Sequence, residues 1–247
     1  MVIILNGQDK PIKGRYGNND LRIRAGNGLI YEGRMKKFDF DKTGLKNIAV
    51  IYWPDENLGF QKIGLTIFEN ARQNELLDSS FISKNTIFLE ERLNYIHNIK
   101  FSLINKPKNI LELFQRKPVV SQVKILNLGK PYLDSLKSLS FDGLFIIFED
   151  KFQDLITGGK SWLPSKGIFK FYNKELVYYG VYSTLIDLNK LKSVKNIGYK
   201  QLSADYSQIP FKEINFMNET QKRILFEELT KRFENNIEEI IRIHKLK

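Results

Sequence analysis

Residues 119–151, VVSQVKILNLGKPYLDSLKSLSFDGLFIIFEDK, contain the pattern that decides the fold. Val119–Leu126 is rich in β-branched residues and roughly alternating, which predicts a strand. Pro131–Leu139 places its leucines at helical spacing, and Gly143–Phe148 is an uninterrupted apolar run with a charged exit. A strand that is apolar on both faces needs cover on both faces. We therefore expect the centre of an α/β sheet here.

The first third of the chain is predicted to be an antiparallel β part. Short apolar segments alternate with turn residues, and Asn27-Gly28 between two of them is a strong hairpin signal. The expected strands are Val2–Leu5, Leu21–Arg24, Leu29–Glu32, Asn47–Trp53 and Phe60–Phe68.

From residue 69 onward, helical and strand patterns alternate. The expected helices are Glu69–Asp78, Glu90–Ile96 and Pro107–Phe114, and the expected strands are Ile99–Ile104, Gly167–Tyr172, Glu175–Tyr182 and Phe211–Met217. The clearest helix is Asn218–Lys247, where Asn218 and Gln221 can form a capping box ahead of one apolar stripe.

These patterns predict a mixed α/β fold. We expect a single domain over residues 1–247, with a β-rich part (1–68) and a mixed α/β part (69–247). In this prediction a central mixed sheet is flanked by helices, an antiparallel β part stands at the N-terminus, and a long helix ends the chain.

The charge of the chain is its strongest global feature. Lysine and arginine number 39 against 28 acidic residues, which gives a formal charge of +11. Such a balance favours a polyanionic partner, because neutralised phosphates release counterions. We expect nucleic acid, above all double-stranded DNA. The alternatives are an anionic membrane surface or a lysine-rich composition inherited from an AT-biased genome.

Composition also excludes several classes of site. The chain has no cysteine, so disulfides, thiolate zinc sites and cysteine nucleophiles are excluded. His97 and His244 are the only histidines, which excludes histidine-rich metal sites. No apolar run approaches the ~20 residues that span a membrane, and the first ten residues lack signal-peptide features. We expect a cytoplasmic protein that does not enter a membrane.

Basic residues near the predicted turns are candidates for DNA contacts. Arg22 and Arg24 lie two residues apart on one strand and so share a face. With Arg15 and Arg34 around the neighbouring turns, they suit a hairpin that follows phosphates or enters a groove. Lys160, in a Gly-rich loop, could contact a further phosphate. The alternative is a solvated outer face of the sheet.

Asp142, Glu149 and Lys151 form the first candidate catalytic set. An acid followed by Glu-x-Lys resembles the PD-(D/E)xK signature of restriction endonucleases, which implies Mg²⁺ held by carboxylates and a lysine beside the attacked phosphate. One extended strand would separate the two acids by ~23 Å and send them to opposite faces. Glu149 and Lys151 could then act together only with a second carboxylate from elsewhere. The alternative is the charged exit of a buried strand.

Gln122 and Lys124 form the second candidate set. Gln122-Val123-Lys124, followed by a helix and a buried strand, resembles the Q-x-K variant of the same nuclease family. The resemblance implies that Gln122 replaces a metal-binding acid, and Glu112 is the nearest upstream carboxylate for the metal.

A third candidate is the hairpin that contains Gly167-Ile168-Phe169 and Tyr178-Tyr179-Gly180. It resembles the paired strands of GIY-YIG nucleases, whose metal-binding glutamate would correspond to Glu227 or Glu228 on a later helix. Phe169 stands where that family has its catalytic tyrosine, and the basic residues near Gly180 are Lys190 and Lys192, not an arginine. Packing of the rings in a core is the alternative.

These candidates favour a sequence-specific, Mg²⁺-dependent DNA endonuclease that resembles type II restriction enzymes. Two alternatives stay open: a non-catalytic DNA- or RNA-binding protein, and a metal-independent, base-flipping DNA glycosylase. Enzymes of the favoured class often act as homodimers, and the apolar C-terminal helix could supply such an interface.

Overall fold

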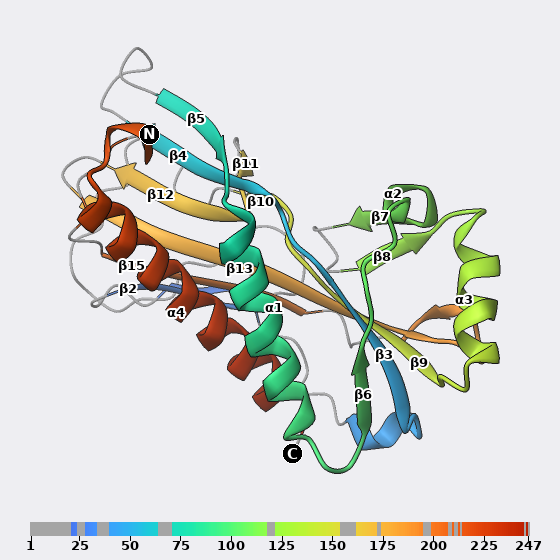
Figure 1. Ribbon diagram of the computed structural model, residues 1–247. Coiled ribbons are helices and arrows are strands. Elements are labelled where there is room, and N and C mark those ends of the chain that lie inside the picture. The colour runs from blue at the N-terminus through green and yellow to red at the C-terminus, as the bar shows by residue number, and fades with distance from the viewer. Residues whose placement is uncertain are drawn as a thin grey trace.

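The structure is a computed structural model that describes residues 21–23, 28–33, 40–63, 71–117, 122–153, 162–171, 174–194, 199–206, 209, 212, 214–244 and 246. The expected strand Val2–Leu5 lies outside these residues. Eleven strands of the described chain form one mixed sheet, and helices cover its faces. Figure 1 shows this arrangement, with the long C-terminal helix across the sheet. The predicted mixed α/β class is therefore confirmed.

The sheet is organised around one long strand, β13 (Lys174–Asp187). The first half of β13 pairs with β12 and its second half with β9, while β15 runs along its other edge. The main path follows the order β1 (Leu21–Ile23), β2 (Gly28–Gly33), β15 (Tyr199–Tyr206), β13, β12 (Lys166–Phe171), β4 (Asn57–Ile63) and β5 (Ala71–Leu76). The branch from β13 contains β9 (Gly143–Phe148), β3 (Asn47–Trp53), β6 (Lys100–Leu103) and the short β14 (Lys192–Ser193).

Smaller elements complete the described fold. Two short hairpin-like pairs join β7 (Phe114–Lys117) to β8 (Gln122–Ile125), and β10 (Phe152–Gln153) to β11 (Trp162–Leu163). The helices are α1 (Ser79–Asn94), α2 (Ile110–Leu113), α3 (Gly129–Ser138) and α4 (Glu219–Ile243), with 3₁₀ turns η1 (Phe40–Thr43) and η4 (Ile214–Phe216).

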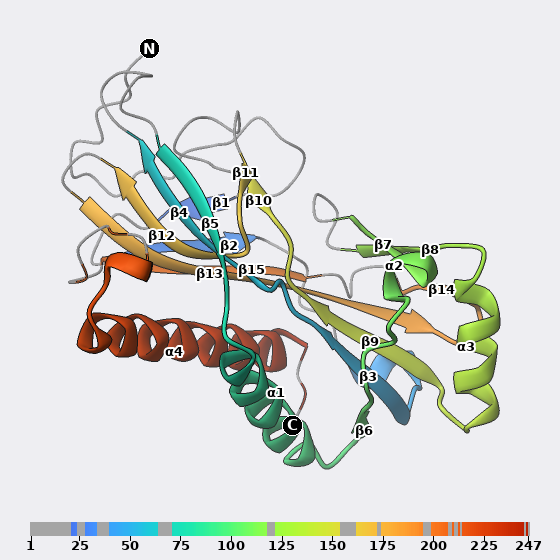
Figure 2. The same cartoon turned by 45° about the horizontal axis from the view of Figure 1, so that its top comes forward.

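The sheet has a separate hydrophobic core on each face. Successive residues of a strand point to opposite faces, so Val50 and Tyr52 of β3 join the cluster under α1 and α4. Ile51 and Trp53 join the cluster formed with α2, β7, β8 and α3. Figure 2 shows α1 and α4 together on one side of the sheet, and α2, α3, β7 and β8 grouped at one end. The apolar run Gly143–Phe148 becomes β9, which is buried along its whole length as predicted.

The C-terminal helix begins where the sequence predicted. Asn218 accepts a hydrogen bond from the Gln221 backbone N–H, and the Gln221 side chain bonds back, which completes the capping box. The apolar stripe that includes Leu225, Leu229 and Phe233 is buried against the protein's own sheet. These three side chains are therefore covered by the chain itself, and the expected homodimer stays a prediction.

Other expectations were wrong. The segment expected as the helix Glu69–Asp78 contains strand β5, because pairing with β4 prevails over the helix-forming composition. Residues 214–216, expected in a strand, form η4. The expected antiparallel pairing in the N-terminal part is confirmed for β1 and β2. By contrast, β3 runs parallel to β9, and β4 runs parallel to β12. The strand after Val119 is β8, which pairs with β7 and, among described strands, not with the main sheet.

Candidate functional site

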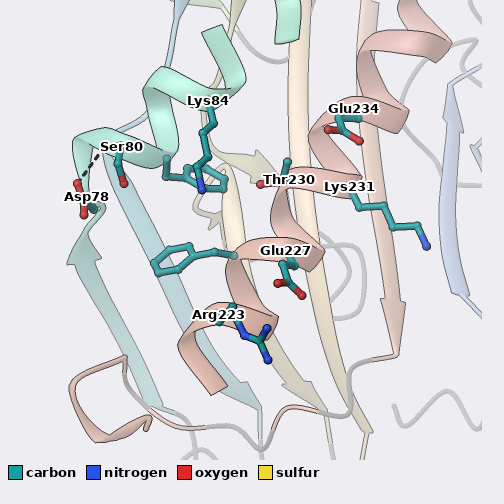
Figure 3. A pocket seen from close by; sticks show the side chains of 10 residues that line it. Asp78, Ser80, Lys84, Arg223, Glu227, Thr230, Lys231 and Glu234 are labelled. Atoms are coloured by element: carbon teal, nitrogen blue, oxygen red, sulfur yellow. Dashed lines mark hydrogen bonds between the residues drawn. The ribbon is translucent and has the colours of Figure 1, made fainter. Parts of the chain in front are cut away.

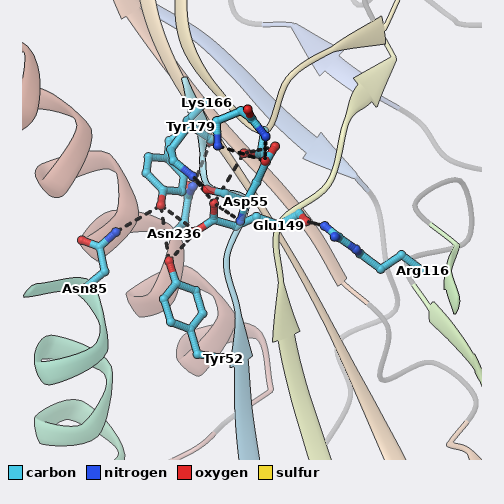
Figure 4. A network of polar contacts seen from close by, with 10 residues as sticks. Tyr52, Asp55, Asn85, Arg116, Glu149, Lys166, Tyr179 and Asn236 are labelled. Atoms are coloured by element: carbon cyan, nitrogen blue, oxygen red, sulfur yellow. Dashed lines mark hydrogen bonds and ion pairs between the residues drawn. The ribbon is translucent and has the colours of Figure 1, made fainter. Parts of the chain in front are cut away.

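A buried polar cluster surrounds Glu149, the residue that follows β9. Its Oε1 accepts hydrogen bonds from the phenols of Tyr52 and Tyr179, the latter at 2.6 Å. Its Oε2 accepts from the Lys166 ammonium and, at 3.1 Å, from the Asp55 backbone N–H. Figure 4 shows these donors converging on one carboxylate. An ionised carboxylate has only acceptor sites, so a shell made of donors matches it.

The cluster extends from the sheet to both long helices. Asn85 of α1 donates to the Tyr179 hydroxyl at 3.1 Å, and Asn236 of α4 donates to the Tyr179 carbonyl at 2.9 Å. At the opposite end, the Ser165 hydroxyl donates to Asp55 Oδ2 at 3.1 Å, and Lys166 also donates to the Asp55 carbonyl. We use "polar cluster" for Tyr52, Asp55, Asn85, Glu149, Ser165, Lys166, Tyr179 and Asn236.

Burial determines the protonation of the phenols. It raises the pKa values of Tyr52 and Tyr179 well above their ordinary value, and the negative charge of Glu149 raises them further. Both hydroxyls therefore keep their protons and act as donors to the carboxylate. Burial also acts to raise the pKa of Asp55, but hydrogen bonds from Asn57 and the charge of Lys166 outweigh it and lower that pKa.

The centre of the polar cluster is closed to solvent, whereas Asp55 at its edge is half-buried. Glu149, Lys166, Ser165 and Tyr179 are each 0% exposed. The two carboxylate oxygens of Glu149 already accept from four donors, so the carboxylate has no free face for a substrate. The cluster therefore joins strands of the sheet to helices α1 and α4.

The predicted pairing of Glu149 with Lys151 does not occur. Glu149 pairs with Lys166 of β12 inside the core, whereas Lys151 is exposed and its carbonyl accepts from the Tyr182 hydroxyl. Asp142 lies at the other end of β9, where its Oδ2 accepts from the backbone N–H groups of Lys46 and Asn47. Asp142 therefore joins the residue before β9 to the start of β3, two segments that are far apart in the sequence.

The second candidate set lies outside the main sheet. Lys124 is exposed on β8, and Glu112 is exposed on the short helix α2. Gln122 begins β8, but its side chain is outside the described residues. In the nuclease resemblance this strand belongs beside the buried central strand, whereas β8 pairs with β7.

The third candidate hairpin exists as β12 and β13, in antiparallel register. Phe169, Tyr178 and Tyr179 are buried, and Phe169 and Tyr178 belong to one hydrophobic cluster. The aromatic residues therefore serve the core, as the alternative interpretation held. Glu227 is exposed and Glu228 half-buried on α4, on a different layer of the fold.

The predicted DNA contacts of the N-terminal part stay predictions. Arg15, Arg24, Arg34 and Lys160 lie outside the described residues, and Arg22 is placed in β1 by its backbone alone.

Sequence reasoning missed most of the polar cluster. Lys166 adjoins an apolar strand, and Asn85 and Asn236 lie on the buried faces of α1 and α4. The sequence did contain one signal for the cluster, because these polar residues stand at positions where the periodicity predicts apolar ones. Their partners could not be inferred, because Tyr52 and Tyr179 approach Glu149 from strands far away in the sequence.

In the described part of the chain, no group of three or more acidic, histidine or cysteine residues is placed to hold a metal. The described helices include none that is long and apolar enough to cross a membrane. Mg²⁺ and the cytoplasmic location stay predictions.

A basic surface lies at the end of the sheet that carries α2, β7, β8 and α3. Residues 106–138, here called the basic lobe, contain seven Lys or Arg residues against Glu112 and Asp134, which leaves a formal charge of +5. Lys108, Lys124, Lys130 and Lys137 are exposed, and none of them makes an ion pair with another described residue. Nearly half of the net charge of the chain is therefore located in one lobe.

A second surface feature is a groove between α1 and α4. It has a volume of about 630 Å³ and lies between the N-terminal halves of the two helices. Phe81 and Phe226 meet in it with ring centroids 5.7 Å apart. Figure 3 shows charged side chains of α4, including Arg223 and Glu227, along one side of the groove and Lys84 of α1 on the other.

Comparison with known proteins gives no family for this chain. No family model and no curated protein matches it. Among solved structures it is similar to the lipoprotein GNA1162 from Neisseria meningitidis (9% identity, 77% of this chain and 99% of that chain, TM-score 0.30). It is also similar to a PelC dodecamer from Paraburkholderia phytofirmans (6%, 89% and 99%, TM-score 0.33). A third is protein XCC0632 from Xanthomonas campestris, of family DUF330 (6%, 92% and 89%, TM-score 0.34).

These comparisons contradict the predicted endonuclease. The three structures named above are a lipoprotein, a PelC protein and a DUF330 protein, and none of them is described as a nuclease. The burial of Glu149 against Lys166 agrees with this correction. TM-scores below 0.5 carry no activity from those proteins to this chain.

Proposed function

We propose that this protein binds nucleic acid through the basic lobe, without cleaving it. The observation that carries the proposal is the concentration of positive charge in residues 106–138, with Lys108, Lys124, Lys130 and Lys137 exposed and without an ion pair to a described residue. Lysines that are not already paired can neutralise phosphates and release counterions, which supplies most sequence-independent affinity for nucleic acid. Double-stranded DNA is the first ligand to test.

The attachment of the lobe to the sheet supports its use as a binding surface. The Arg116 guanidinium of β7 lies 4.3 Å from the centre of the Trp53 ring of β3. It also donates to the Glu149 carbonyl and lies 3.9 Å from Asp150. One arginine therefore joins β7 to the end of β9 and to the polar cluster. A rigidly held basic surface loses less entropy on binding than a mobile one.

The test is a titration of fluorescent 20-base-pair DNA by anisotropy at several salt concentrations. The variant Lys124→Gln/Lys130→Gln removes two charges of the lobe. Lys42→Gln/Lys222→Gln removes two charges elsewhere and serves as the matched control. For B-DNA the logarithm of the affinity falls with that of the salt concentration, with a slope of about 0.9 per phosphate neutralised. We expect the slope to fall by about 1 for each lobe lysine removed, and no comparable change in the control.

Two outcomes would refute the proposal. Equal losses in the lobe variant and in the control would show that net charge, and not this surface, determines binding. Binding to vesicles that contain anionic lipid, with none to DNA or RNA, would assign the lobe to a membrane surface instead. Single-stranded DNA and RNA of the same length, measured in parallel, identify the preferred nucleic acid.

A further inference from the structure

Four charged residues of α4 differ from the other charged residues of that helix. Lys222, Arg232 and Arg242 pair with acids one turn away, and Glu238 pairs with Arg92 of α1. By contrast, Arg223, Glu227, Lys231 and Glu234 make no ion pair with another described residue. We call these four residues the charged stripe.

The charged stripe lies along the groove between α1 and α4. All four residues line the groove, and the first three are exposed to solvent. Their spacing of four, four and three residues places them on one face of the helix. Figure 3 shows the four side chains projecting from the same stretch of α4.

The order of charges in the stripe is antisymmetric. Read from Arg223 to Glu234, the signs are plus, minus, plus and minus. The midpoints of the outer pair (223 and 234) and of the inner pair (227 and 231) both fall near Leu229. A second helix of the same sequence, turned antiparallel about that point, places each positive charge opposite a negative one. A parallel alignment would instead oppose like charges.

We propose that the groove between α1 and α4 is a self-association surface, occupied by α4 of a second copy of this chain. A two-fold axis near Leu229 sets Arg223 opposite Glu234 of the second copy, and Glu227 opposite Lys231 of the second copy. Such an interface is isologous, because each contact occurs twice. In such a dimer each residue of the charged stripe faces an opposite charge of the second copy, whereas within one chain it makes no ion pair with a described residue.

The floor of the groove adds an apolar component to this interface. Phe226 of α4 is half-buried and rests against Phe81 of α1. The Arg92–Glu238 ion pair joins the helices beyond the groove, toward their C-terminal ends. A helix is ~10–12 Å across with its side chains, and the two rings are in contact, so the partner's α4 would lie over the groove and cover these rings.

The test is sedimentation velocity of the full chain over a range of protein concentrations. We expect reversible dimers that dissociate between ~0.05 and ~1 M NaCl, because the Debye length shortens from more than 10 Å to about 3 Å. Arg223→Glu turns two attractive contacts of the dimer into repulsive ones and should weaken it roughly ten- to thirtyfold. Glu234→Arg should do the same.

The decisive experiment mixes the variants Arg223→Glu and Glu234→Arg. In a heterodimer of Arg223→Glu with Glu234→Arg, every reversed charge again meets its opposite. An equimolar mixture should therefore dimerise at concentrations at which each variant alone, with its weakened dimer, is mainly monomeric. The double variant R223E/E234R should recover it as well. Arg242→Glu, on the same helix and paired within it, is the control and should leave the dimer unchanged.

Three results would overturn the inference. The first is a wild-type chain that keeps the mass of one 28.9 kDa subunit at every concentration. The second is a dimer that Arg223→Glu does not weaken. The third is a mixture that shows no recovery while circular dichroism confirms that both variants are folded. The groove lies on the face of the sheet opposite the basic lobe, so the outcome is independent of the proposed binding of nucleic acid.

Discussion

Lys166→Met tests the role assigned to the polar cluster. The Lys166 side chain is fully buried, and its ammonium group bonds to Glu149 and to the Asp55 carbonyl. Methionine fills a similar volume without the charge, so Glu149 would remain buried with neutral donors alone. Removal of one partner from a buried ion pair costs about 3–5 kcal/mol. That is a large share of the roughly 5–15 kcal/mol by which domains are stable.

The assay is urea unfolding, followed by tryptophan fluorescence and circular dichroism. Lys170→Met is the matched control, because Lys170 lies on the same strand and pairs with Glu175 at 2.7 Å while its side chain is 29% exposed. Partly exposed pairs contribute at most about 1 kcal/mol. The double variant K166M/E149Q removes the uncompensated charge and should be about 2 kcal/mol more stable than Lys166→Met alone.

The reasoning about the polar cluster would be refuted by either of two results. One is a loss of stability in Lys166→Met no larger than that in Lys170→Met. The other is a double variant no more stable than Lys166→Met, since the coupling between the two charges would then be absent. If the slope of the free energy of unfolding against urea concentration is the same in all variants, they all unfold from the same compact state.

Two further predictions concern single residues in the core. Burial lowers the pKa of His244 from 6.5 to about 4, so the unfolded chain binds a proton in this range that the folded chain does not. The free energy of unfolding should therefore fall by about 3 kcal/mol as the pH drops from 6.5 to 4. Urea unfolding at a series of pH values measures this dependence, and His244→Phe should remove it. An unchanged pH dependence in His244→Phe would assign it to other groups. A Cβ on Gly167 would lie 1.9 Å from the carbonyl oxygen of Gly59 on the paired strand. Gly167→Ala should lower the free energy of unfolding by more than about 2 kcal/mol. Gly44 also has a positive φ but has open space around it, so Gly44→Ala should lower this free energy by only about 1 kcal/mol. Equal losses in the two variants would contradict the contact with Gly59.

Local patterns were sufficient for several elements. Asn47–Trp53 and Gly143–Phe148 were predicted with the bounds of β3 and β9, because continuous apolar runs bounded by polar residues depend little on distant context. The capping box at Asn218 is likewise a local signal, formed within four residues. Where the local preference was helical and the tertiary pairing was not, as in β5, the prediction failed.

Four features could be predicted from the sequence: the mixed α/β class, the buried central strand, the capped C-terminal helix and the excess of positive charge. Each of these depends on residues that are close together in the chain or on composition alone. Three features emerged from the structure alone: Glu149 pairs with Lys166, Tyr52 and Tyr179 donate to the same carboxylate, and the charged stripe borders a groove. These contacts join segments from different strands and helices. The burial of the Glu149 carboxylate arises only once those segments pack together.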